Sequence, residues 1–380
     1  MKREIQMKKP DYVLLRNGKN AFPEIIQCIR NAKESILIVM FIWRGDHIGH
    51  ILAQEVLDAA DRGVKVEIIK DRYGVLFELS EEDQTAMLHD EISIIETFKI
   101  LGMEMFYHPS QFNKHHIQKD ALFQKMKAHP NITILNNKTL YDHSKIYIFD
   151  NKIMIFGGIN IEDKENGKDK ENRFYKDLMV KTDDERLIRQ YLDVTGGFDQ
   201  ELPAVVYNRY SPKKHFDIKE MYLQMLMQAK EKIFIMMPYL SPVKEITDEL
   251  IKALDRNVTL EILVPVRSNL SSDLNKSVIA ELYSYANEHE KKIHVFFTND
   301  MSHTKLVCTD QMISFGSANM TRKAFELLGE TNILIRNDDS PLAKSVREFI
   351  QDEKNNATEI QGNKDLTYSS LRVFIERLFT

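Results

Sequence analysis

Two stretches that lie far apart in the chain share one order of apolar and polar positions. Residues 34–42 (ESILIVMFI) and 231–239 (EKIFIMMPY) are apolar runs of strand length, rich in β-branched side chains. Each is followed by apolar residues at helical spacing and then by a second apolar run, within 60–69 (ADRGVKVEII) and 254–263 (LDRNVTLEIL). The pattern predicts a strand–helix–strand unit in each half, with its two strands parallel.

The ends of the two helices and the join between the halves are also marked. Gly63 and Asn257 stand at matched places after each helical pattern, and both residue types accept the left-handed conformation that caps a helix. Pro203 and residues 211–215 (SPKKH) interrupt the periodicity between the halves. We therefore predict an α/β protein of two similar lobes, each a mixed β-sheet flanked by helices, related by a pseudo-two-fold axis.

The predicted lobes cover residues 1–205 and 206–380. Residues 75–130 have no counterpart in the second half, so we predict a helical insertion in the first lobe. Packing of this insertion on its own lobe is the simpler interpretation, and a lid or membrane-docking element is the alternative. Beyond residue 366, the spacing of apolar residues predicts a C-terminal helix.

Composition narrows the class of function. The chain has 52 basic and 57 acidic residues and a formal net charge of −5, whereas proteins held on a nucleic-acid backbone usually carry excess positive charge. Nucleic acid is therefore not the expected partner. Two cysteines make no disulfide framework, and the sequence shows neither a signal peptide nor an apolar run of about 18 residues. These features predict a cytoplasmic protein without a transmembrane helix.

Each half also carries one copy of a polar motif. Residues 142–160 read DHSKIYIFDNKIMIFGGIN, and residues 302–319 read SHTKLVCTDQMISFGSAN. Side chains two positions apart leave the same face of a strand, so His143 should point with Lys145, and the second copy repeats this pair. That second pair is His303 and Lys305.

An aspartate follows each histidine by the same interval. Asp150 and Asp310 belong to the motif, and we group them with its catalytic residues. Their odd offset places them on the other strand face, however, so we expect them to support the strand and its turn by hydrogen bonding.

Small residues, amides and carboxylates complete each copy. Gly158 and Ser317, each preceded by a glycine, should let the backbone approach a substrate anion, and the amides that follow can donate to the same oxygens. These amides are Asn160 and Asn319. One carboxylate in each later strand could orient a histidine by accepting from its ring N–H. These carboxylates are Asp177 and Glu330.

Two such copies facing each other would form one site for phosphoryl transfer. Lysines and amides would neutralise the phosphoryl oxygens, one histidine would attack phosphorus, and the other would protonate the leaving alkoxide. This chemistry needs no metal or other cofactor. A lone His-x-Lys is more often a surface or core feature, but polar residues recurring at matched places in a duplication are not explained by packing.

The chain resembles the phospholipase D superfamily, whose signature is His-x-Lys, then Asp, then Gly-Gly/Ser-x-Asn, used twice. Within that superfamily it is most similar to bacterial cardiolipin synthases. The resemblance spans most of the chain and is carried by residues 14–43, 60–74, 157–180, 237–254 and 316–335.

The resemblance implies a fold and a mechanism. It implies two α/β lobes around a central site, with His143 as the nucleophile and His303 as the general acid and base. The two lysines and the two asparagines would bind the phosphate. A synthase of this type transfers a phosphatidyl group from one phosphatidylglycerol to another, or to another alcohol, without metal or nucleotide. Because the expected membrane-spanning helices are absent, the chain would dock peripherally on a membrane surface.

Two other functions remain open from the sequence. One is a phosphodiesterase of the same superfamily that hydrolyses phospholipid or nucleic acid, because water and alcohols compete for the same phosphohistidine. The other is a catalytically silent, membrane-associated binding protein, which the intact motif pairs argue against. The sequence predicts no particular oligomeric state.

Overall fold

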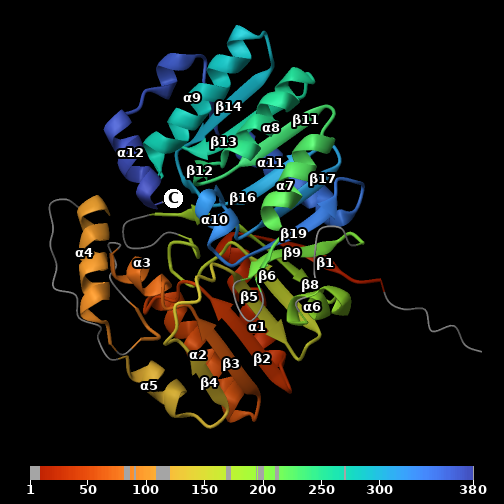
Figure 1. Cartoon of the computed structure of the whole chain (residues 1–380). Coiled ribbons are helices and arrows are strands. Elements are labelled where there is room, and N and C mark those ends of the chain that lie inside the picture. The colour runs from red at the N-terminus through yellow and green to blue at the C-terminus, as the bar shows by residue number, and fades with distance from the viewer. Residues whose placement is uncertain are drawn as a thin grey trace, which may run out of the picture.

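The computed structural model describes residues 9–80, 86–89, 91–107, 120–167, 173–193, 195, 201–209, 214–268 and 271–379. Two large β-sheets stack against each other, and helices cover the outer face of each (Figure 1). This arrangement confirms the predicted α/β fold with two similar halves.

The first sheet has seven strands and mixes parallel with antiparallel pairs. β2 pairs parallel with β3 and antiparallel with β5, which in turn forms a hairpin with β6. In spatial order the strands are β1 (Tyr12–Arg16), β8 (Leu178–Thr182), β6 (Ile153–Gly157), β5 (Lys145–Phe149), β2 (Ser35–Met40), β3 (Lys65–Lys70) and β4 (Ile132–Leu135).

The second sheet repeats this order and adds an edge strand at each side. The parallel pair β11–β13 and the hairpin β16–β17 correspond to β2–β3 and β5–β6. Its nine strands are β10 (His215–Phe216), β9 (Ala204–Arg209), β19 (Glu330–Arg336), β17 (Met312–Gly316), β16 (Lys305–Thr309), β11 (Lys232–Met236), β13 (Thr259–Pro265), β14 (Ile293–Thr298) and β20 (Thr358–Glu359). The duplicated pattern in the sequence therefore produces duplicated sheets.

The join between the halves falls at β9. This strand pairs antiparallel with β19, as β1 pairs with β8 in the first sheet. It spans the predicted boundary between residues 205 and 206, so the chain enters the second sheet slightly earlier, at Ala204.

Three apolar cores explain why the central strands are apolar on both faces. In β5, Tyr147 and Phe149 face the helices of the first lobe, whereas Ile146 and Ile148 face the second sheet. The first outer core involves α1 (Asn17–Asn31), α2 (His47–Asp61) and α5 (Ala121–Ala128). The second involves α7 (Ile218–Gln228), α8 (Lys244–Asp255) and α9 (Ser272–Glu288). The core between the sheets also receives α6 (Glu185–Leu192) and α11 (Pro341–Asn355).

Helix ends follow the predicted caps. Gly63 has φ +94° directly after α2, and Asn257 has φ +65° after α8. Both lie in the left-handed region that reverses the chain into the next strand.

The described part of the insertion in the first lobe contains three helices joined by irregular segments. It contains α3 (Gly74–Ser80), α4 (Ile94–Tyr107) and α5, and α3 and α4 share a small apolar core of their own. Residues 81–85, 90 and 108–119 of the predicted insertion lie outside the described part. In the second lobe, the described residues between the corresponding strands, β13 and β14, form one helix, α9.

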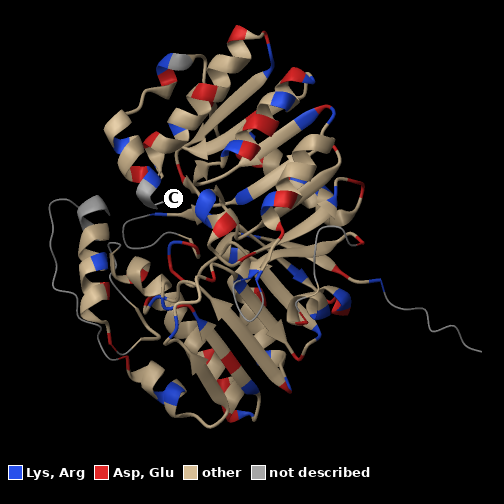
Figure 2. Cartoon of the chain, viewed as in Figure 1, with Lys and Arg blue, Asp and Glu red and all other residues tan. Residues whose placement is uncertain are grey.

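The remaining elements are short or peripheral. They are β7 (Tyr175–Lys176), β12 (Leu240–Ser241), β15 (Met301–Ser302), β18 (Met320–Thr321), α10 (Arg322–Glu326), a 3₁₀ turn at Asn363–Leu366 and α12 (Ser370–Phe379), the C-terminal helix that the spacing predicts. Acidic and basic residues intermingle over the helices of both lobes, while the strands are mostly uncharged (Figure 2).

Candidate active site

The two motif histidines are fixed by backbone bonds to the opposite lobe. His143 N–H donates to Gly329 O at 2.7 Å, and His303 N–H donates to Lys176 O at 2.8 Å. Next to these bonds, β15 pairs with β7 across the lobes, and Asp142 forms a matching bridge with Gly329. The same crossing therefore occurs twice, once in each direction.

The histidines lie just before their strands, and the lysines begin them. Lys145 is the first residue of β5 and Lys305 the first of β16. Each ammonium group folds back to the carbonyl two residues earlier, at 2.5 Å from His143 O and His303 O. The structure thus brings each predicted His–Lys pair together, with only the lysine inside the strand.

The two carboxylates serve the histidines of the opposite halves. His143 Nδ1 lies 3.1 Å from both carboxylate oxygens of Glu330. His303 Nδ1 lies 3.0 Å from Asp177 Oδ2, which also receives the ammonium of Lys305 at 3.1 Å. Because Nδ1 faces a carboxylate in both rings, Nε2 is the nitrogen left for substrate.

Burial and positive charge control the protonation of both rings. Burial, and then the charges of Lys145 and Lys305, lower the pKa of His143 well below its usual value. At His303, burial and the same two lysines lower the pKa, and His143 contributes in the same direction. The two rings therefore share one electrostatic environment.

The pKa values of the neighbouring groups are shifted in directions that complement those of the rings. Burial lowers the pKa of Lys145 to about 7 against the opposing charge of Glu330. Burial raises the pKa of Glu330 to about 8 and also raises that of Asp177. Each carboxylate–imidazole pair can thus hold a proton that a bound anion would draw onto the ring.

The two asparagines present unbonded buried oxygens. Asn160 is 2% exposed and Asn319 is 7% exposed. Among the described residues, neither Oδ1 has a hydrogen-bond partner. Buried amides without partners are costly, which is consistent with side chains that await a ligand.

Gly158 and Ser317 have a different role from the one predicted. Their N–H groups donate to Leu178 O at 2.9 Å and to Thr331 O at 3.0 Å, so they are not available to a substrate anion. A Cβ at Gly158 would overlap the carboxylate of Asp177. These two residues therefore lie against the carboxylates, and a contact with phosphate through their backbone N–H groups is not supported by this geometry.

Ser317 does this by hydrogen bonding. Its hydroxyl donates to Glu330 Oε2 at 2.5 Å, on the carboxylate that faces His143.

Asp150 and Asp310 lie outside the site, so their grouping with the catalytic residues is wrong. Each aspartate comes directly after the last residue of its strand, at the end opposite the motif lysine. Asp150 accepts from the backbone N–H groups of residues 33, 34 and 35 at 2.7–3.2 Å, and Asp310 from those of residues 230, 231 and 232 at 3.0–3.4 Å. This is the strand and turn support that their offset predicts.

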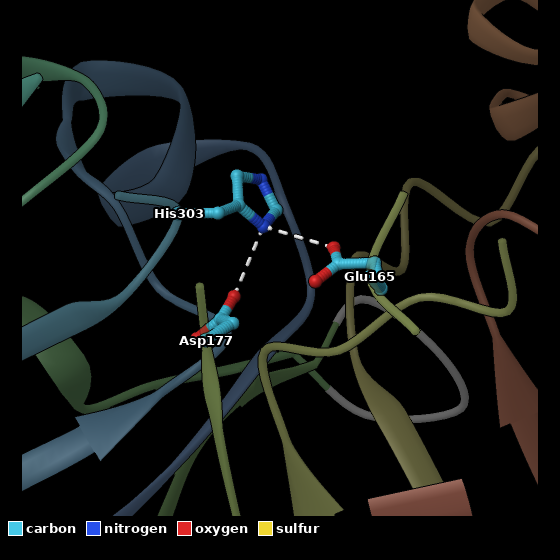
Figure 3. A group of neighbouring side chains, drawn as sticks. All are labelled: Glu165, Asp177 and His303. Carbon is cyan, nitrogen blue, oxygen red and sulfur yellow. Dashed lines mark ion pairs between the residues drawn. The ribbon is translucent and has the colours of Figure 1, made fainter. Parts of the chain in front are cut away.

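A carboxylate that the sequence analysis missed lies beside His303. Glu165 is fully buried, and its Oε1 is 3.2 Å from His303 Nδ1, the same ring nitrogen that Asp177 contacts (Figure 3). Its segment, EDKENGKDKEN, has the composition of a solvated loop. The structure instead buries Glu162 and Lys164 as well, through a 2.7 Å ion pair of Glu162 with Arg44.

The three groups in Figure 3 also have the spacing of metal-binding atoms. One atom each from Glu165, Asp177 and His303 lies within 4.8 Å of the others. However, Lys305 already supplies a positive charge 3.1 Å from Asp177, so we assign no metal to this position.

Aromatic rings flank the two histidines. The Phe41 ring packs edge-on against His143 with centroids 4.7 Å apart. Tyr175 and Tyr239 lie 5.6 and 6.4 Å from His303. These rings contribute to the burial of the imidazoles, and burial is the largest of the causes that lower their pKa values.

The stacked sheets and the paired His–Lys–Asn sets define a duplicated α/β protein with one site shared by its halves. The chain belongs to the family described as "Cardiolipin synthase, PLD-like domain", whose sequence pattern matches residues 25–194 and 222–353. The predicted membership of the phospholipase D superfamily is thereby confirmed.

Curated relatives extend over most of the chain. Cardiolipin synthase of Geobacillus kaustophilus (strain HTA426) is 25% identical over 364 residues, covering 89% of this chain and 65% of that protein. Cardiolipin synthase 2 of Staphylococcus epidermidis (strain ATCC 12228 / FDA PCI 1200) is 27% identical over 371 residues, covering 90% and 68%. The chain thus spans about two thirds of the length of these relatives.

Solved structures share the fold. Phosphatidylserine synthase from Haemophilus influenzae Rd KW20 has a TM-score of 0.67 and 14% identity, covering 97% of this chain and 92% of that one. Polyphosphate kinase from Porphyromonas gingivalis has a TM-score of 0.55 and 12% identity, covering 97% and 52%. At these identities the likeness concerns the fold alone.

Proposed function

We propose that this chain is a phosphatidyltransferase of the cardiolipin synthase type. It would move a phosphatidyl group from a phosphatidylglycerol-like donor to an alcohol through a phosphohistidine. The observation that carries the proposal is the crossed geometry, in which His143 and His303 each face the other lobe's carboxylate through Nδ1. The cardiolipin synthase relatives support a glycerophospholipid as the substrate.

The same residues would hold the phosphodiester. Lys145 and Lys305 place two buried ammonium groups beside the rings, and the Nδ2 groups of Asn160 and Asn319 would donate further hydrogen bonds to the phosphate. In a site closed to water, these groups stabilise the charge that develops on the phosphoryl oxygens.

The transfer takes two steps that reverse the role of one ring. In the first, Nε2 of His143 bonds to phosphorus, the P–O bond to the leaving alcohol breaks, and His303 gives its Nε2 proton to that oxygen. In the second, His303 takes a proton from the acceptor alcohol, whose oxygen bonds to phosphorus as the P–N bond breaks. Glu330 would stabilise the positive charge on the phosphorylated ring throughout.

The proposal includes peripheral association with a membrane surface. Among the described residues, no helix is both long and apolar enough to cross a bilayer. Large apolar side chains nevertheless face solvent on α4 and α12, which lie along the same edge of the view in Figure 1. Ile94, Ile95 and Phe98 of α4 are 77%, 68% and 71% exposed, and Leu371 and Phe374 of α12 are 69% and 65% exposed. Such side chains can enter the interface of a bilayer.

Purified protein mixed with phosphatidylglycerol liposomes and EDTA tests the proposal. Mass spectrometry of the lipids should show cardiolipin, with glycerol released in equal amount. The chelator should not reduce the rate, because the chain's own lysines and amides carry the charge of the phosphate.

The His143→Ala variant is the control for contaminating activity and should form no product. Phosphatidic acid without cardiolipin would show hydrolysis and overturn the transferase proposal. Activity that appears only after a divalent metal is restored would overturn the phosphohistidine scheme.

A further inference from the structure

The surroundings of the two histidines differ in one carboxylate. Glu165 lies five residues after Asn160, and the residue five after Asn319 is Ala324. Among the described residues, His303 therefore makes ion pairs with two buried carboxylates, whereas His143 makes one, with Glu330. Duplication of the fold does not by itself produce this difference. Its cause should therefore lie in the chemistry of the site.

The additional carboxylate is buried without a fixed partner. Both Oε atoms of Glu165 lack a hydrogen bond to any described residue, and so does His303 Nδ1, because the 3.2 Å contact between them is outside hydrogen-bond geometry. The Glu165 carboxyl group nevertheless already lies within 3.2 Å of the ring nitrogen. A buried carboxylate without a hydrogen bond is costly as a structural feature alone.

Positive groups around His303 make a protonated ring hard to maintain. The ring is surrounded by Lys305 on β16, Lys145 on β5, Lys164 in the segment after β6 and the imidazole of His143. Asp177 alone offsets little of this positive charge, because its Oδ2 also accepts a hydrogen bond from the ammonium group of Lys305. The ring needs a further negative group, or a nearby proton donor, to act as an acid.

We propose that Glu165 is a positioning residue that stores the proton of the general acid His303. This inference rests on the proposed function. When an anionic phosphodiester binds, the proton moves from Glu165 Oε1 to His303 Nδ1, and the ring then donates its Nε2 proton to the leaving alcohol. When the acceptor alcohol gives its proton to Nε2, the Nδ1 proton returns to Glu165.

The charges around Glu165 agree with a stored proton. Burial, then the negative charges of Asp177 and Glu162, raise the pKa of Glu165 well above its usual value, and Lys305 and Lys164 oppose this only in part. Two neighbouring buried carboxylates cannot both ionise readily, so one of them retains a proton near neutral pH.

The test is the pH dependence of Glu165→Gln with two donors. With phosphatidylglycerol, the loss of kcat/KM should be on the order of 10²-fold at pH 8 and should shrink toward pH 5.5, where solvent can protonate His303 directly. With dioctanoyl phosphatidyl-p-nitrophenol, whose leaving group needs no acid, the loss should be about threefold or less.

Two further variants separate a proton store from a structural role. Glu165→Asp retains a carboxyl group and should recover most of the activity at pH 8. Glu261→Gln removes another buried carboxylate, which pairs with Lys232 of β11 and Lys354 of α11, and should leave the pH profile unchanged.

Equal losses with both donors and an unmoved pH profile would overturn the inference. Wild-type release of phosphatidic acid instead of cardiolipin would overturn only the transferase proposal, because hydrolysis uses the same acid. If the wild type cleaved neither donor, the proposed function and this inference would both fail.

Discussion

The two lobes share a backbone plan but not the chemistry around their histidines. Each sheet has the same strand order, and each strand hairpin presents a His–Lys pair at the same end. His143 faces Glu330, which Ser317 holds by a hydrogen bond. His303 instead faces Asp177 and Glu165.

This comparison teaches that symmetry in the fold can support opposite roles at the site. A nucleophile needs a neutral ring whose one carboxylate steadies the charge that forms on it. A general acid needs a ring that is protonated when the leaving group departs, and a second carboxyl group beside the ring can supply that proton. One histidine receives fewer acidic groups from the opposite lobe than the other does. That histidine would thus have the environment that suits a nucleophile.

Substituting either histidine should give the largest effects. If the two variants behaved alike, the proposed difference between the two histidines would be wrong. His143→Ala should abolish transfer, by about 10⁴-fold or more, and leave no phosphorylated protein, because nothing else can attack phosphorus. His303→Ala should slow transfer by about 10²- to 10⁴-fold and let a covalent intermediate persist, because its breakdown lacks a base. Intact-protein mass spectrometry after mixing with the p-nitrophenyl donor measures both. A label found only on His303 in the wild type would reverse the assignment.

The small residues beside the carboxylates should give intermediate and unequal effects. In Gly158→Ala, the new methyl group would push Asp177 away from His303, and a displacement of this kind costs about 10²-fold in rate. In Ser317→Gly, Glu330 loses one hydrogen bond, so transfer should fall by only about tenfold.

Initial rates of cardiolipin formation, with the thermal midpoint measured alongside, check this pair. Equal effects would mean that the two carboxylates depend on their neighbours in the same way, against the asymmetry seen here.

The motif aspartates should give the smallest effect on catalysis and a measurable one on stability. Asp150→Asn and Asp310→Asn should keep the rate within about twofold while lowering the thermal midpoint by a few degrees. Partial burial opposes ionisation, but the backbone N–H groups outweigh it and lower the pKa of both aspartates. A lowered pKa stabilises the fold above the unfolded value, about 3.9, and this stabilisation disappears as the pH falls through the folded value.

Thermal unfolding curves at pH 7 and at pH 3.5 test the direction of this pH dependence. The difference between wild type and each variant should be present at pH 7 and shrink at pH 3.5. A loss of rate as large as that of the histidine variants would return these aspartates to the active site.

Much of the fold was predictable because it depends on local patterns. Apolar runs, helical spacing and the left-handed residues Gly63 and Asn257 place the paired strands and helices. The role of Asp150 in supporting the strand and its turn also followed from counting residues. These features need no knowledge of how the lobes meet.

The crossed carboxylates and Glu165 could not be predicted, because they depend on contacts between distant segments. Asp177 follows the motif of His143 in sequence, yet it lies at His303. Glu165 lies among charged residues that usually remain in solvent, and only the tertiary structure shows that this stretch is buried. Gly158 likewise suggested an anion cradle until its N–H was found bonded to Leu178.

The exchange of backbone bonds at Gly329 and Lys176 has a consequence for how the two copies could diverge. In an assembly of two identical half-length chains, any residue gained beside one histidine would appear beside the other. Joining the copies in one polypeptide removes that constraint, so a glutamate can stand on one side while alanine occupies its counterpart. Covalent linkage would then have allowed two originally identical histidines to take different roles.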